Sequence, residues 1–223
     1  MQHLTTFALL AAVLGTSACS NRSLVVTKPA DPRLNEDITV MWARDIERNA
    51  RTGDWILTRS YSFTGDVITL TTSGERVSHA SIYDARTGTV IEALRPTVRE
   101  VPLANLLDRN QLAIVIRPSG MSQAQRVAAV ERARGQIGVE FDLAGLIGFD
   151  DDSKFYCSEL VYWASGLDPA KRPTIVTPAS LMDFGEVVYY SGKRDERAVQ
   201  DAAYQQPGLL AERRRARVLA SIQ

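Results

Sequence analysis

The chain has 223 residues, enough for one domain with a hydrophobic core and an additional N-terminal segment. Its 26 Lys and Arg residues balance its 26 Asp and Glu residues, so the charge gives no reason to expect nucleic acid or an acidic partner. The sequence contains no glycine-rich phosphate-binding loop and no paired CxxC zinc spacing, and we therefore expect neither a cofactor nor a metal.

The N-terminus predicts a secretory signal over residues 1–19. The first 21 residues contain no Asp, Glu, Lys or Arg, and a mostly apolar run extends from Phe7 to Gly15. This run is too short to span a bilayer, and small residues follow it, as in segments that are removed after export. We therefore expect an exported protein.

The small residues of this segment lead directly to Cys19. The triplet Ser-Ala-Cys resembles the bacterial lipobox, in which the cysteine is lipidated after cleavage. The resemblance implies lipidation of Cys19. The next residue is Ser20 rather than an aspartate, which resembles the pattern of lipoproteins sorted to the outer membrane. We expect a membrane contact through this lipid, because a multiply acylated cysteine anchors stably. The alternative is cleavage after Ala18 without a lipid.

The rest of the chain is expected to form one domain over residues 34–195, with a tether at 20–33 and a basic helical tail at 196–223. Apolar periodicity, caps and turn residues predict the elements of this domain. They are a helix at 35–51, a turn and short strand within 52–60, a hairpin at 79–94, a buried strand at 112–118, helices at 122–135 and 156–165, and a strand at 186–192. The first helix has an apolar face of Ile38, Met41, Trp42 and Ile46, and the helix at 122–135 begins with a capping box of Ser122 and Gln125. Residues 65–78 fit either a strand or one helical turn.

Cys157 stands at the start of the helix 156–165 and allows two interpretations. With Leu160, Val161 and Ala164 it forms an apolar helical face, which favours a thiol that only fills the core. A thiol at a helix N-terminus is also stabilised as a thiolate, and a neighbouring imidazolium would lower its pKa further. If Cys19 carries lipid, Cys157 has no cysteine partner within the chain.

His79 is the only histidine left after removal of the signal, so it alone can activate this thiol. It opens one strand of the predicted hairpin, and Glu92 lies in the returning strand. With a loop from Asp84 to Thr87, His79 stands directly opposite Glu92, and the carboxylate can fix the tautomer of the imidazole. The alternative is that Glu92 points to water from a half-exposed strand.

The segments GDWILTR, SHASIYD, VIEAL and FDLAG…FYCSELVYWA together resemble the YiiX/YebB-like branch of the NlpC-type cysteine hydrolases. These are circularly permuted papain-like proteins in which the histidine precedes the cysteine. The resemblance covers roughly residues 51–190. It implies an α+β papain-like fold, with a small antiparallel sheet and packed helices. It also implies Cys157 as the nucleophile, His79 as the base and later the acid, and Glu92 as the orienting group.

Several neighbouring residues are expected to have lesser roles. The backbone N–H of Cys157 is a candidate donor to an oxyanion, because it lies at a helix N-terminus. Tyr156 is expected to pack, and Asp142 to be structural. Glu159 suits the helix dipole without a catalytic role. The acidic run 150–152 is expected to be a solvated loop, with a cation site as the alternative.

We therefore expect an exported cysteine hydrolase that cleaves an amide or ester bond through a thioester intermediate. Its substrate partner would be a cell-wall peptide or a lipid-linked acyl group. An acyltransferase shares the first half of this reaction, so the triad residues alone do not separate the two activities. A binding or structural envelope lipoprotein with an idle site is a third hypothesis.

Overall fold

The computed structural model describes residues 28–61, 77–149 and 151–205. Its α-helices are α1 (Pro32–Asn49), α3 (Leu103–Asp108), α4 (Gln123–Arg134), α5 (Cys157–Ser165) and α6 (Arg197–Tyr204). Its strands are β1 (Trp55–Ser60), β2 (His79–Asp84), β3 (Thr89–Leu94), β4 (Thr97–Pro102), β5 (Asn110–Pro118) and β6 (Gly185–Tyr190). Short 3-10 helices lie at Gly145–Ile147, Pro169–Lys171 and Ser180–Phe184.

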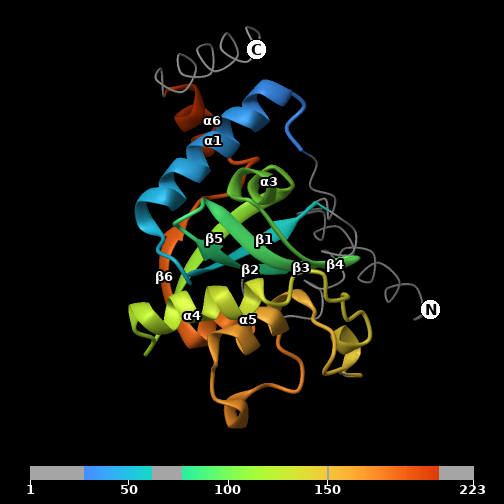
Figure 1. Cartoon of the computed structure of the whole chain (residues 1–223). Helices are drawn as coiled ribbons and strands as arrows, with labels where there is room; N and C mark the ends of the chain where they lie inside the picture. The colour runs from blue at the N-terminus through green and yellow to red at the C-terminus, as the bar shows by residue number, and fades with distance from the viewer. Residues whose placement is uncertain (1–27, 62–76, 150, 206–223) are drawn as a thin grey trace, which may run out of the picture.

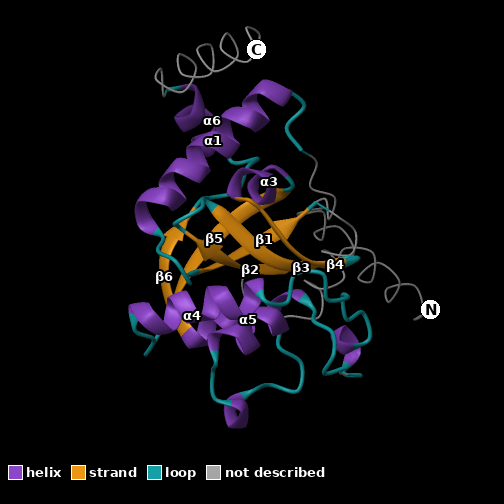
Figure 2. Cartoon of the chain, viewed as in Figure 1, coloured by secondary structure: helices purple, strands orange, loops and turns teal. Residues whose placement is uncertain are grey.

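The strands form one antiparallel sheet in the order β4-β3-β2-β1-β5-β6. Helices α4 and α5 cover one face of this sheet, and α1, α3 and α6 lie on the other (Figures 1 and 2). Successive strand residues point to opposite faces, so Trp55 packs toward α4 and α5 while Ile56 packs toward α1 and α3. The structure therefore confirms the predicted α+β class with a small antiparallel sheet and packed helices.

Helix α4 begins and ends as its sequence predicts, whereas α1 begins at Pro32, within the predicted tether and before the predicted start at residue 35. Asp31 caps α1 by accepting the backbone N–H of Arg33 at 2.8 Å. In α4, Ser122 and Gln125 form the predicted capping box, and the helix ends at Gly135. The face of α1 that was predicted to be apolar is fully packed: Ile38, Met41, Trp42 and Ile46 are all buried.

The C-terminal part of the domain differs from the expected boundary at residue 195. Helix α6 lies beyond that boundary, packs beside α1, and contributes Val199 and Ala203 to the core on that face (Figure 1). The folded domain therefore extends past the predicted start of the tail. Cys19, residues 65–76 of the ambiguous segment and the last part of the tail lie outside the described residues. Within the described ranges, no helix is long and apolar enough to cross a membrane.

Candidate active site

Cys157 is the first residue of α5, and its side chain is buried against the sheet. Tyr156 precedes the helix in an extended conformation, and Gly166 ends it in the left-handed region at φ 65°. Leu160, Val161 and Ala164 are fully buried, so the predicted apolar face of α5 is real. Burial alone would favour the interpretation of Cys157 as a core residue, and its partners have to decide the question.

His79 and Glu92 contact each other across the β2–β3 hairpin: His79 Nε2 lies 2.6 Å from Glu92 Oε2. The predicted register is nevertheless wrong by two residues. Asp84 pairs with Thr89, and the same register continued past the last pair, Ile82 with Ile91, would set Glu92 opposite Ser81 rather than opposite His79. Because the slip is even, it leaves the two side chains on the same face, where they meet diagonally.

The thiol of Cys157 lies where β2 and β3 stop pairing. Both strands are described throughout, and their pairing ends at Ile82 with Ile91. The backbone N–H of Tyr83 bonds Asp54 on the β1 side, so that of Ala80, three residues earlier, points toward the β3 side. With the ladder ended, the Ala80 N–H donates to the sulfur of Cys157 instead. The start of α5 therefore takes the place of a strand partner at the end of this ladder.

Two arginines complete the surroundings of Glu92, whose side chain is 0% exposed. Arg99 Nε donates to Glu92 Oε1 at 3.0 Å, and it belongs to the residue directly opposite Glu92 in β4. Arg109, which follows α3, donates through Nη2 to Glu92 Oε2, the oxygen that also contacts His79. The buried carboxylate thus faces three cationic groups, and the alternative of a solvated Glu92 is excluded.

Burial and hydrogen bonding set the charges of this group. Burial raises the pKa of Glu92, but its bonds to His79 and Arg109 outweigh this and hold it far below its usual range. Burial lowers the pKa of His79, yet Cys157 and Glu92 together raise it to about 9. Burial raises the pKa of Cys157, while His79 and the Ala80 N–H lower it by more. At neutral pH the site therefore holds an imidazolium and a carboxylate, and the lowered pKa of Cys157 favours its thiolate.

The model of the family described as permuted papain-like amidase enzymes, YaeF/YiiX, C92 family, matches residues 49–167, more than half of the chain. The chain belongs to this family. It is accordingly a papain-like cysteine hydrolase of the amidase type. The crystal structure of the metalloprotein YiiX from Escherichia coli O157:H7 is similar, with 23% identity and a TM-score of 0.45 over 62% of this chain and 87% of that chain. No curated protein matches the chain.

Asp142 and Tyr156 hold the segments that flank the thiol of this amidase. Asp142 is buried and accepts the backbone N–H groups of Gly145 at 2.8 Å and Asp151 at 3.1 Å, which fixes the loop before α5. The hydroxyl of Tyr156 accepts the backbone N–H of Val176 at 2.9 Å. The structural role expected of Asp142 and the packing role expected of Tyr156 agree with these contacts.

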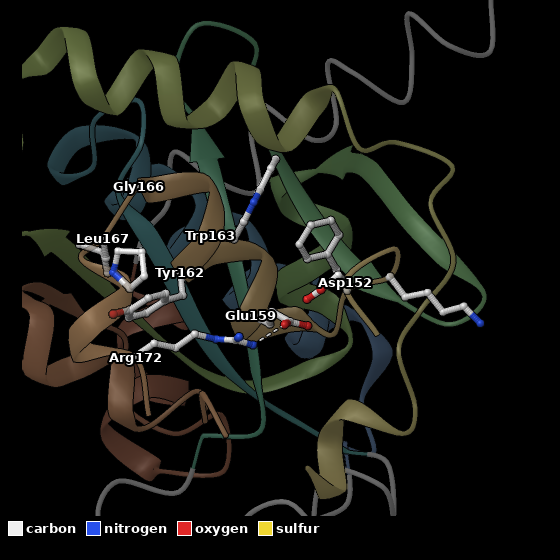
Figure 3. A pocket seen from close by; sticks show the side chains of 10 residues that line it. Asp152, Glu159, Tyr162, Trp163, Gly166, Leu167 and Arg172 are labelled. Atoms are coloured by element: carbon white, nitrogen blue, oxygen red, sulfur yellow. Dashed lines mark hydrogen bonds and ion pairs between the residues drawn. The ribbon is translucent and has the colours of Figure 1, made fainter. Parts of the chain in front are cut away.

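A cavity of about 510 Å³ lies along α5 of the amidase, beginning at Glu159, two residues after Cys157 (Figure 3). Trp163 and Phe155 form one wall, with ring centroids 5.0 Å apart. Glu159 and Arg172 form an ion pair of 2.5 Å in the lining, drawn as a dashed line. The cavity therefore offers both aromatic surface and paired charges next to the helix that carries the thiol.

The described part of the chain contains no group of three or more His, Cys, Asp or Glu side chains that could hold a metal ion. The acidic run 150–152 forms no such group among its described members, Asp151 and Asp152. Asp151 accepts from Ser153 and lies 3.7 Å from Lys154. These contacts are those of an ordinary polar loop.

Proposed function

We propose that Cys157, His79 and Glu92 are the catalytic triad of this amidase. The observation that carries the proposal is mutual stabilisation: the buried thiol and the buried imidazole each favour the charged form of the other. The thiolate is the nucleophilic form of cysteine, and only about 3% of an unperturbed thiol is ionised at pH 7. A buried thiol that served only the core would have no use for an imidazolium partner.

In the first half-reaction the sulfur of Cys157 attacks the carbonyl carbon of an amide, and the electron pair of the carbonyl moves to its oxygen. The backbone N–H of Cys157, at the first position of α5, is our candidate donor to that oxyanion. Glu92 occupies Nε2 of His79, which leaves Nδ1 to face the sulfur. The imidazolium gives its proton to the leaving nitrogen as the C–N bond breaks. The product is a thioester on Cys157.

In the second half-reaction water attacks the thioester carbon, and neutral His79 accepts a proton from that water. The C–S bond breaks, the acid product leaves, and the thiolate–imidazolium pair is restored. An acyltransferase would use another acceptor in place of water with the same residues. Hydrolysis is the activity that membership of an amidase family supports.

We propose an envelope substrate, either a cell-wall peptide or a lipid-linked amide. We also propose that the cavity along α5 binds a part of this substrate that is remote from the scissile bond. The aromatic wall supports this role, because Trp163 lines the cavity and is 43% exposed. Replacing Trp163 with Ala should raise KM for an identified substrate and leave kcat nearly unchanged. A loss confined to kcat would contradict this role of the cavity.

We also propose that the amidase is exported and anchored to the outer membrane through lipid on Cys19. The uncharged apolar segment before Cys19 and its lipobox-like triplet support this proposal. Radiolabelled palmitate fed to expressing cells should label the parent chain and not a Cys19→Ala variant. Equal recovery of both proteins in the soluble periplasmic fraction would refute the anchor.

The pH dependence of Cys157 alkylation tests the catalytic proposal. Iodoacetamide labelling of the folded chain is followed by mass spectrometry on the peptide that contains Cys157, because Cys19 is a second cysteine. The proposal predicts fast labelling that persists well below neutral pH and is lost in His79→Ala. A single titration near pH 8.5 in both proteins, or labelling only after denaturation, would return Cys157 to the core and leave an idle site.

A further inference from the structure

The two arginines that contact Glu92 do different things to its two oxygens. Arg99 Nε holds Oε1 at 3.0 Å from the facing strand β4. Arg109 reaches Oε2 from the end of α3, and that same oxygen lies 2.6 Å from His79 Nε2. One oxygen of a fully buried carboxylate is therefore shared between an imidazole and a guanidinium, while the other is fixed by a second guanidinium.

We propose that Arg99 and Arg109 are positioning residues for His79: Arg99 fixes the rotation of the Glu92 carboxylate, and Arg109 neutralises part of the charge on the oxygen that holds the imidazole. The proposal rests on the catalytic roles proposed above. The described charged groups that face this carboxylate or the imidazole are Cys157 from α5, Glu92 from β3, Arg99 from β4 and Arg109 beside α3.

The contact of Arg109 and His79 with the same oxygen of Glu92 changes the pKa of His79 in a predictable direction. A guanidinium and an imidazolium are like charges, so Arg109 on Oε2 disfavours the protonated form of His79, whereas Glu92 favours it. The pKa of His79 is raised to about 9 with Arg109 in place. Because Arg109 and the imidazolium share one oxygen and carry like charges, we expect this pKa to rise further without Arg109. A buried glutamate without this compensation would hold the imidazolium too firmly for the base step of deacylation.

With Arg109 bound, Glu92 exerts less negative charge on the His79 imidazole. It then acts more like a neutral orienting group, such as the asparagine of papain-like Cys-His-Asn sites. The guanidinium side chains of Arg99 and Arg109 are 38% and 29% exposed, so solvent screens part of their charge. We therefore expect each to shift the pKa of His79 by less than the one to three units typical of close unscreened charges. Arg109 should have the larger effect, because it is less exposed and bonds the same oxygen as His79.

The test is an NMR titration of the His79 imidazole in the full chain. A His3→Gln background leaves His79 as the only histidine, so its ring signal needs no further assignment. The parent should titrate near pH 9. Arg109→Gln should raise that pKa by about half a unit to one unit, and Arg109→Lys, which keeps the charge, should restore the parent value. Arg99→Gln should give a smaller rise.

An unchanged or lowered His79 pKa in Arg109→Gln would overturn the proposal, as would Arg109→Lys behaving like Arg109→Gln. If Arg109→Gln loses its dispersed amide spectrum, Arg99→Gln decides, since an unchanged His79 pKa there overturns the proposal as well. This titration needs no substrate and no reaction of the thiol. A failed alkylation test with a shifted His79 pKa would therefore reject catalysis and leave the positioning of His79 by the arginines intact.

Discussion

Replacing Glu92 with Gln should both destabilise the fold and lower the pKa of His79. The side chain keeps its size and one acceptor oxygen, but it loses the charge that faces His79, Arg99 and Arg109. Burial still lowers the pKa of His79, while one of the two groups that raise it has lost its charge. The imidazolium should therefore release its proton well below pH 9, and the thiolate should lose its partner.

The size of the effect follows from the pKa of His79. A rise of the His79 pKa from 6.5 to about 9 corresponds to about 3 kcal/mol of stabilisation of the imidazolium, to which Cys157 and Glu92 both contribute. Breaking a fully buried ion pair from one side typically costs 3–5 kcal/mol, but both arginines are partly exposed and can turn to solvent. We expect Glu92→Gln to lose about 2–3 kcal/mol of unfolding free energy at pH 7.

Urea unfolding of parent and variant at pH 7 measures this loss, and the His79 titration measures the pKa. Glu140→Gln is the matched control, because Glu140 pairs with Lys154 at 3.0 Å on the surface, where its side chain is 72% exposed. That control should change the unfolding free energy by no more than about 0.5 kcal/mol. A Glu92→Gln variant as stable as the control, with the His79 pKa still near 9, would refute the reasoning.

The raised pKa of His79 stabilises the fold fully below pH 6.5, and this contribution is lost as the pH rises through about 9. The lowered pKa of Cys157 stabilises the fold fully above the pKa of the thiol in the unfolded chain, and this contribution is lost as the pH falls. The two slopes oppose each other, so urea midpoints of the parent should fall less with rising pH than those of Cys157→Ala, in which Glu92 still raises the pKa of His79. Parallel curves would contradict this linkage. Asp142→Ala frees two backbone N–H groups of the loop before α5 and should cost about 1–3 kcal/mol in urea unfolding, against little for a change at an exposed loop position. Arg194→Met should cost about 3 kcal/mol by the same assay, because the buried guanidinium donates to backbone carbonyls in α1, α3 and β5; a cost under 1 kcal/mol would mean that water replaces it.

The sequence allowed the elements around the site to be predicted because their signals are local. The capping box at Ser122 and the apolar face of α1 each depend on a few neighbouring residues, and both are found in the structure. The diagonal contact of His79 with Glu92 shows the limit of such local reasoning. Asp84 was expected in the loop, but it pairs with Thr89. Its carboxylate accepts the backbone and side-chain N–H groups of Arg86 within the turn.

The residues that the sequence analysis missed come from longer-range packing. Arg99 was within reach, because counting back from the tight turn at Arg95–Pro96 places it opposite Glu92. Arg109 was not, since its position depends on how α3 packs on the sheet. The packing of α6 was missed for a similar reason. Residues 196–223 were predicted as a basic helical tail outside the domain, and only the contacts of this short helix with α1 bury Val199 and Ala203.

The position of the thiol depends on the divergence of β3 from β2. Strand β3 keeps its pairing with β4 as far as Leu94 and Thr97, although its pairing with β2 has ended at Ile91. The chain that leads to α5 follows β4 rather than β2: Glu140 bridges Thr97, and Phe141 bridges Phe155. Cys157 therefore lies beside β2 at the point where β3 has diverged from it. Continuing the β2–β3 ladder to its next hydrogen-bonded pair, Ala80 with Ala93, would use the Ala80 N–H, so the thiolate would lose that donor and its pKa would rise.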